Sequence, residues 1–396
     1  MDESPSRCPH DPRTLPVDGT PLRPSTWFAE RRAEGSASPL RYADGHDGLV
    51  VTGYETARAV LADARFSQQP QRFPLGPASP VRAVIDPLAL LAMREADLLS
   101  LDAPQHSRIR RAVLGRFSFK AVRTRVDAVR GLAARAFGEF VRCGSPADLG
   151  EGFAVPFATS VHALVLGIPD DRLDRYRQLF AGHGLGQERV DFARELLGLA
   201  EASPAETVFG DLVRSDLTPA EQLGVSVALL SSGHDSVAYF LATGSLALLQ
   251  HPDQLAALRE DRALLPGAIE EMIRYGAMFL TLFPRTATVD VEVAGLTVAA
   301  GRTVSVSPVG VNRDPSHFPD PDRFDIRRDA EGHLGFGHGI HGCVGQQLAR
   351  LELTEGFSLL LDLPGLRLVH ADQLEPQPLA HDVATYAAGR VVVAWG

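Results

Sequence analysis

Apolar side chains recur at helical spacing along much of this 396-residue chain. The spacing predicts helices over Trp27–Glu34 and Tyr54–Ala64, and several amphipathic helices between residues 120 and 215. Glycine and proline interrupt helices, so we expect breaks in the last group at residues 144–146, 169 and 182–186.

Shorter runs have the alternation that is typical of strands. They predict strands at residues 49–52, 289–298 and 303–306, and several short strands after residue 363. Because these runs are few and short, the fold class is expected to be mainly α with a minor β region.

The strongest helix start lies at Thr218–Glu221. Thr218 is a good N-cap, Pro219 suits the first helical position, and Glu221 completes a capping box. The helical pattern continues to about Gln250, which predicts one helix of roughly 48 Å. Gly233 would lie in its middle at a cost of about 1 kcal/mol relative to alanine, so this glycine needs a physical reason.

A second unusual stretch, residues 336–345, combines four glycines, two histidines and one cysteine just before a predicted helix at Gln346–Leu361. Peptide N–H groups and the helix dipole lower a thiol's pKa, so we expect Cys343 to be deprotonated. Glycines 337, 339 and 345 permit unusual dihedrals and a flat backbone. A single cysteine cannot build a zinc or iron–sulfur site alone, but it can be the one axial ligand of haem iron.

This stretch resembles the ligand loop of the cytochrome P450 haem-thiolate monooxygenases, F-G-x-G-x-H-x-C-x-G. The fixed positions are filled by Phe336, Gly337, Gly339, His341, Cys343 and Gly345. The resemblance extends from about residue 45 to the end. It implies the cytochrome P450 fold in a single haem domain (1–396), whose N-terminal part (1–25) is a flexible arm. It also implies haem b bound through Cys343, with Phe336 beside the thiolate and His341 reaching a propionate.

Further motifs support the resemblance. His106 and Arg110 are four residues apart, so on a helix both can address one anion, although a solvated basic face is the common alternative. The family places H-x-x-x-R here to bind a haem propionate, and an arginine in the position of Arg285 to bind a propionate as well.

The family pattern A/G-G-x-D/E-T matches at Gly233 and Asp235, while Ser236 replaces the threonine. The resemblance implies that Gly233 lies against the haem ring and that Asp235 and Ser236 deliver protons. Serine keeps the hydroxyl but lacks the stiff χ1 of threonine, so delivery is expected to be looser. A polar stripe without catalytic function is the alternative for Ser231 and His234.

Glu271 and Arg274 form an E-x-x-R pair, which is worth only about 0.2–0.5 kcal/mol on an exposed helix. In the family this pair is buried, belongs to the scaffold, and is completed by an arginine in the position of Arg323. The resemblance also assigns a pocket-lining strand at 278–283 and a pocket wall at 67–95. The candidate substrate contacts are Leu280, Thr281, Leu282, Val383 and Ala384.

Composition limits the classes of molecule that this protein is expected to bind. The chain has 39 Lys+Arg and 49 Asp+Glu, hence a net charge of −10, which argues against nucleic acid and anionic membranes as partners. Three scattered cysteines favour a reducing compartment. No stretch reaches the roughly 18 apolar residues of a membrane span. We therefore expect a cytoplasmic protein.

The expected function is a haem-thiolate oxidoreductase that uses O2 to oxidise a mid-sized apolar small molecule, in secondary-metabolite biosynthesis. The chain has no flavin or nicotinamide fingerprint, so a ferredoxin and its reductase should supply electrons, with Arg350 a candidate docking residue. One alternative is oxidative C–C or C–N coupling of aromatic, for example cyclodipeptide-like, substrates without oxygen insertion; Ser236 favours it. The other is a non-catalytic haem sensor, against which the Asp235–Ser236 pair argues.

Overall fold

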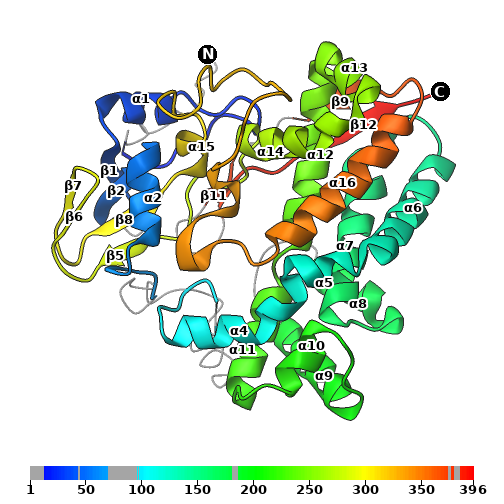
Figure 1. Ribbon diagram of the computed structural model, residues 1–396, viewed down its shortest axis with the longest axis horizontal. Coiled ribbons are helices and arrows are strands. Elements are labelled where there is room, and N and C mark those ends of the chain that lie inside the picture. Colours follow the sequence, from blue (N-terminus) through cyan, green and yellow to red (C-terminus); the bar gives the residue numbers. More distant parts are fainter. Residues whose placement is uncertain are drawn as a thin grey trace, which may run out of the picture.

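The computed structural model describes residues 13–42, 45–69, 96, 98–180, 186–372, 376–378 and 384–396. Figure 1 shows a β region on one side of the molecule and a larger helical region on the other, with α12 crossing the helical region. This arrangement has the mainly α character with a minor β region that the sequence predicts.

Helices are the main regular elements of the described chain. They are α1 (Trp27–Glu34), α2 (Tyr54–Ala62), α4 (Gln105–Phe117), α5 (Phe119–Arg123), α6 (Val126–Arg142), α7 (Val155–Leu166), α8 (Leu173–Phe180), α9 (Gln187–Ala202), α10 (Val208–Val213), α11 (Pro219–Leu230), α12 (His234–Gln250), α13 (Pro252–Glu260), α14 (Leu265–Tyr275), α15 (Pro308–Val311) and α16 (Gln346–Asp362).

The strands form small sheets. One sheet has the order β1-β2-β8-β5-β3, in which only β2 and β8 pair in parallel, and the others are β4-β12-β9, β6-β7 and β10-β11. Their bounds are β1 (Ala37–Arg41), β2 (Asp47–Val51), β3 (Phe66–Ser67), β4 (Ala147–Asp148), β5 (Arg285–Ala287), β6 (Val291–Val293), β7 (Leu296–Val298), β8 (Thr303–Val306), β9 (Arg367–Ala371), β10 (Gln377–Pro378), β11 (Ala384–Thr385) and β12 (Val391–Ala394).

Two glycines let α16 pack closely on α12. A Cβ on Gly244 of α12 would lie 2.7 Å from the Phe357 ring of α16, and a Cβ on Gly356 of α16 would lie 2.7 Å from the Leu241 side chain of α12. At each of these glycines, a large side chain of the other helix fills the space that a side chain at the glycine would occupy. The helix that begins just after Cys343 is in this way fixed against the helix that begins at His234.

Several predicted elements are confirmed at or near their predicted ends. The structure has the helix at 27–34, the one starting at Tyr54, the strand at 303–306, and a helix over 346–362. The capping box of Thr218 and Glu221 is present. Part of the predicted N-terminal arm belongs to the core, because Leu22 is buried and its carbonyl accepts a hydrogen bond from Arg313 at 3.3 Å.

The single long helix predicted over 218–250 is wrong. It is divided into α11, which ends at Leu230, and α12, which begins at His234. Gly233 has φ of 108°, a conformation outside the helical region that side chains disfavour. Gly233 therefore permits the break between the two helices, and it does not lie in the middle of one helix as predicted.

The predicted strand at residues 278–283 is wrong as well. The segment forms one isolated bridge, between Phe279 and Thr385, and its peptide groups bond to two different neighbours. Leu280 N donates to Ala384 O at 2.9 Å, whereas Leu282 N donates to Val306 O at 2.8 Å. Because it changes partner within three residues, the segment cannot form a regular ladder, and β5 begins only at Arg285.

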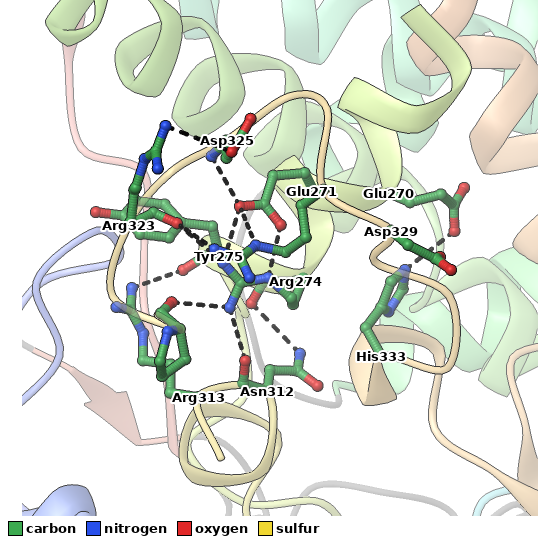
Figure 2. A network of polar contacts seen from close by, with 12 residues as sticks. Glu270, Glu271, Arg274, Tyr275, Asn312, Arg313, Arg323, Asp325, Asp329 and His333 are labelled. Carbon is green, nitrogen blue, oxygen red and sulfur yellow. Dashed lines mark hydrogen bonds and ion pairs between the residues drawn. The ribbon is translucent and has the colours of Figure 1, made fainter. Parts of the chain in front are cut away.

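The E-x-x-R pair is buried, as expected. Arg274 and Glu271 are fully inaccessible and form a two-pronged ion pair at 2.6 and 2.8 Å. Arg274 also donates to the carbonyl oxygens of Asn312 at 2.7 Å and Pro321 at 2.9 Å, so it binds the irregular segment after α15 (Figure 2).

Arg323 does not complete this pair, contrary to the prediction. Its side chain is 66% exposed and faces Asp325 at 3.6 Å, and only its carbonyl reaches Arg274. Arg328 instead brings a largely buried guanidinium 3.3 Å from Glu271. The second cation thus comes from five residues further along the chain.

We expect Arg274→Ala to lower the free energy of unfolding by about 3–5 kcal/mol, because it leaves the Glu271 carboxylate buried without its main partner. Arg323→Ala is the matched control, and its cost should stay within about 0.5 kcal/mol because that side chain is exposed. Urea unfolding of the haem-loaded protein, followed by haem absorbance, measures both. Equal losses in the two variants would contradict the assignment of the buried pair as the structural anchor.

Candidate functional site

The ligand loop is two tight turns followed by α16. Turns at residues 334–336 and 339–341 precede Cys343, whose N–H donates to Phe336 O at 2.8 Å. Gly339 has φ of 73°, and a Cβ there would clash with the Leu61 carbonyl of α2. Gly345 has an ordinary φ of −85°, so the prediction of an unusual dihedral fails at this glycine.

The environment of the thiol is mixed. Cys343 has accessible surface, yet the protein atoms crowded around its thiol raise its pKa by desolvation. Backbone N–H groups at Gly345 and Gln346, and the Arg110 and Arg350 guanidinium groups, oppose this rise without cancelling it. The prediction that the local backbone keeps the thiol ionised is therefore wrong. A metal deprotonates a coordinating thiol outright, so ionisation would require the metal.

Three of the predicted propionate ligands meet beside this loop. His106 of α4 and His341 lie with ring centroids 4.4 Å apart, and Arg285 of β5 lies 3.3 Å from His341 Nδ1. His341 Nε2 contacts the Leu101 carbonyl at 2.7 Å. The fold thus brings together one guanidinium and two imidazoles from residues that are far apart in the sequence.

His106 and Arg285 are buried and His341 is half-buried, and no carboxylate among the described residues forms a hydrogen bond with them. The nearest acid, Asp102, acts on all three through its charge but accepts its own hydrogen bonds from Ser67 and Gln68. Neither ring nitrogen of His106 has a hydrogen-bond partner among the described residues, and neither has Nε of Arg285. Burial lowers the pKa of Arg285 to about 10, and burial together with the charge of Arg285 lowers that of His341 to about 4. Buried polar groups are normally hydrogen-bonded, so this cluster lacks a ligand. The carboxylates of a haem are of the right charge to supply it, and the residues fit that group.

Arg110 shares the face of α4 with His106 but takes a different partner. It donates to the Gly342 carbonyl at 2.6 Å, next to the cysteine. Arg350 lies over the Phe336 ring, 4.6 Å from its centroid, and pairs with Glu270 at 2.6 Å. Its charge is therefore compensated within the chain, which weakens the expectation that it docks a ferredoxin.

The start of α12 presents the other predicted site residues. Gly233 is exposed, and the partly exposed Ser236 donates from its hydroxyl to the Gly233 carbonyl at 3.2 Å. The Asp235 carboxylate is turned toward its neighbour, with Oδ1 3.0 Å from His234 Nε2. The two residues thus have different polar partners although they are adjacent in the chain.

The candidate substrate contacts are brought together in part. Leu280 and Thr281 are fully buried, and the Thr281 hydroxyl has no partner among the described residues. The backbone bond from Leu280 places Ala384 beside them, and Leu282 is partly exposed. Val383 lies outside the described residues, as does most of the predicted pocket wall at 67–95.

Sequence reasoning missed a buried polar group beside Asp235. His162 of α7 and Tyr176 of α8 join His234 in a hydrogen-bonded cluster. A single histidine in an apolar helix, such as His162, gives no local signal in the sequence. The three side chains come from separate helices, so only the packing of those helices brings them together.

A lone cysteine just before a helix, beside a buried arginine and a buried histidine whose nitrogen atoms lack hydrogen-bond partners among the described residues, is an arrangement that fits a thiolate-ligated haem. The family model described as cytochrome P450 matches residues 187–385. The chain is 36% identical over 384 residues to cytochrome P450 105C1 of a Streptomyces species, which covers 93% of this chain and 95% of that relative.

A second relative is the mycinamicin IV hydroxylase/epoxidase of Micromonospora griseorubida, with 32% identity over 378 residues that cover 90% of this chain and 93% of that protein. The crystal structure of cytochrome P450 MoxA from Nonomuraea recticatena aligns with a TM-score of 0.82 and 28% identity, over 98% of this chain and 99% of that one. This chain belongs to the cytochrome P450 family. It is a haem-thiolate oxidoreductase, and haem b is its cofactor. Among the described helices, none is both long and apolar enough to cross a membrane.

We expect Cys343→Ser to abolish the carbon monoxide absorption that is typical of thiolate-ligated ferrous haem, because a serine hydroxyl does not replace the thiolate. Cys143→Ser is the control, since Cys143 is the other free cysteine of the described chain and is exposed. Difference spectra of the reduced proteins give the answer. An unchanged spectrum in Cys343→Ser would mean that another residue is the ligand.

Proposed function

We propose that this protein is a monooxygenase that inserts one oxygen atom from O2 into a mid-sized apolar metabolite in a secondary-metabolite pathway. The observation that carries this proposal is the Asp235–Ser236 pair at a helix break, where both side chains are accessible. A relative named as a mycinamicin IV hydroxylase/epoxidase supports the reaction class. A non-catalytic sensor would have no use for an acid and an alcohol at this position.

The residues of the chain have separate tasks in this proposal. Cys343 would ligate the iron, Phe336 would pack near it, and His106, Arg285 and His341 would bind the carboxylates of the haem. When bound, haem supplies the oxidation chemistry itself. Arg110 would stabilise the loop and the thiolate through the Gly342 carbonyl and its nearby charge.

Asp235 and Ser236 would move protons in the site. The Ser236 hydroxyl is partly exposed and anchored by the Gly233 carbonyl, so it can accept a proton and pass one on without a large movement. The Asp235 carboxylate is 39% exposed, which lets it exchange protons with water. Leu280, Thr281, Leu282, Val383 and Ala384 are proposed to contact the substrate.

The electrons would come from a ferredoxin and its reductase, because the sequence contains no fingerprint for a flavin or nicotinamide cofactor. A hollow of about 590 Å³ beside Phe336 and Gly337 is bordered by Arg327, Arg328 and Arg350, and also by the acidic residues Glu270, Asp329 and Glu331. Arg327 is exposed, so it is a better candidate than Arg350 for binding an acidic partner. The cytoplasmic location that the sequence favours stays a prediction.

Oxidative coupling of aromatic rings is the second candidate function, and Ser236 is the observation that favours it. A serine without the stiff χ1 of threonine holds its hydroxyl less firmly, which matters less where no oxygen atom is retained.

Comparative mass spectrometry of extracts from the source strain, with and without the gene, tests the two functions. Under oxygen insertion, the product that disappears should be heavier by one oxygen than the precursor that accumulates. A lost product lighter than its precursor by two hydrogens, or a lost dimer short of two hydrogens, would instead establish coupling and refute the first proposal.

We expect Ser236→Ala to divert electrons into hydrogen peroxide, because the hydroxyl that moves the proton is gone. Product per NADPH should fall about tenfold or more, in line with the 10²–10⁴-fold that positioned acid–base groups contribute, whereas Ser236→Thr should keep or raise it. The assay uses the precursor found by mass spectrometry with a ferredoxin and reductase. Turnover that persists without ferredoxin would exclude it as the donor, and an unaltered yield in Ser236→Ala would count against the relay.

A further inference from the structure

A second acid of α14, Glu270, binds the ligand loop at two places. Its carboxylate accepts two hydrogen bonds from Arg350 of α16, from Nε at 2.6 Å and from Nη2 at 2.9 Å. The same carboxylate lies 3.1 Å from His333 Nε2, just before the first turn of the loop (Figure 2). One carboxylate thus connects the chain that precedes Cys343 with the helix that follows it.

The contact with His333 fixes the first turn of the loop. His333 is buried, and its Nδ1 accepts the N–H of Gly335 at 3.1 Å, because a backbone N–H only donates. A carboxylate only accepts, so His333 Nε2 carries the proton and donates to Glu270. A Cβ on Gly335 would clash with Ile273 of α14, so this turn lies directly on the helix. Glu270 therefore holds, through His333, the turn that contains Phe336.

Arg350 is held over the Phe336 ring. Its guanidinium carbon lies 4.6 Å from the ring centroid, within the range of a cation–π contact. Its Nη1 donates to the side-chain oxygen of Gln346 at 3.1 Å, while Nε and Nη2 bind Glu270. Because the donors of a guanidinium lie in a rigid plane, these bonds fix its orientation. Burial raises the pKa of the Cys343 thiol, and the charge of Arg350 is among the groups that oppose this rise, so that charge reaches the sulfur.

Glu270 adds a negative charge beside this guanidinium. Burial alone would raise the pKa of its carboxyl, but the hydrogen bonds from His333 and Arg350 lower it to about 2, so the carboxylate is ionised at neutral pH. Arg110, the other guanidinium that acts on the thiol, donates to a backbone carbonyl. Of these two arginines, only Arg350 has a hydrogen-bonded carboxylate within the described residues, and its charge is therefore offset.

We propose that Glu270 lowers the reduction potential of the haem iron by offsetting the charge of Arg350, which it holds on the Phe336 ring. Reduction from the ferric to the ferrous state adds one electron, and so one negative charge, to the haem. A nearby positive charge stabilises the added electron, and a nearby negative charge destabilises it. The surroundings of the axial ligand are among the features by which a protein sets a haem potential. The inference rests on the proposed ligation of the iron by Cys343, and it is independent of what becomes of the oxygen atom.

Other charged side chains lie along the border of the hollow beside Phe336. They are Arg327, Arg328, Asp329 and Glu331. Variants of Glu270 and Arg350 leave these four charges unchanged, so differences among such variants report the Glu270–Arg350 pair alone.

Titration of the haem-loaded proteins with dithionite in the presence of redox dyes measures the potential. The side chains of Arg350 and Glu270 are 31% and 24% exposed, so water screens their charges in part. Glu270→Gln leaves the charge of Arg350 unbalanced, so the ratio of ferrous to ferric haem at a fixed potential should rise about threefold, which is about 28 mV at about 59 mV per tenfold. Arg350→Gln should lower this ratio about threefold, and in the double variant the shifts should cancel to within about 1.5-fold.

Glu355→Gln is the matched control. Glu355 lies on the same helix as Arg350, further from the cysteine, and accepts two hydrogen bonds from Arg130 at 3.0 and 3.1 Å. Its substitution should change the ratio by no more than about 1.5-fold. Arg350→Lys keeps the positive charge, so it should also stay close to the wild type.

Two outcomes would overturn the proposal. One is that Glu270→Gln and Arg350→Gln shift the potential in the same direction, or by no more than Glu355→Gln does, since a loss of packing alone has no sign that follows the charge. The other is that Arg350→Lys shifts the potential as far as Arg350→Gln does, because the charge would then not be the cause.

The carbon monoxide difference spectrum shows whether each variant binds haem through the thiolate. If Glu270→Gln does not bind haem, the double variant compared with Arg350→Gln measures the same charge, and its ratio should be about threefold higher. The spectrum of Cys343→Ser tests the ligation separately. Confirmed ligation with unmoved potentials refutes this inference alone, whereas an unchanged spectrum in Cys343→Ser refutes the ligand assignment on which it rests.

Discussion

The buried ion pair between Glu271 and Arg274 is the contact on which the ligand loop depends. Arg274 holds the carbonyl of Asn312, whose side-chain oxygen accepts the N–H of Leu334 at 2.7 Å. Leu334 begins the turn that ends at Phe336, and the Phe336 carbonyl accepts the N–H of Cys343. A charge pair on α14 therefore positions the thiol through a short series of hydrogen bonds. Since the pair is inaccessible to water, neither screening nor solvent exchange loosens this connection.

The site combines rigid support with buried polar atoms that lack hydrogen bonds among the described residues. The close packing of α12 and α16 fixes two walls, and Gly339 brings the loop against α2. Inside this frame, His106 and Arg285 have buried nitrogen atoms that the described residues leave without partners. Leaving such atoms without partners is unfavourable unless a ligand binds them. These atoms are therefore stronger evidence for haem carboxylates than the sequence spacing of His106 and Arg110.

The break before α12 determines both where the helix begins and how its first side chains are placed. It exposes Ser236 and Gly233 and turns Asp235 toward a buried histidine–tyrosine cluster. His162 of α7 and Tyr176 of α8 contact this region, so residues from outside α12 surround His234, the neighbour of Asp235.

The sequence by itself determined the elements whose signals are local. The capping box at Thr218 and helices such as 27–34 and 346–362 depend on residues close in the chain, and these predictions were confirmed. Tertiary structure decided what depends on residues far apart. The His162 ring lies 3.0 Å from where a Cβ on Gly233 would be, which leaves little room for a side chain at the helix break. Glu271 binds Arg328 and not Arg323, and the 278–283 segment divides its hydrogen bonds between Ala384 and Val306. The pKa of Cys343 is raised because protein atoms from several elements crowd around its thiol, and no local sequence pattern indicates that packing.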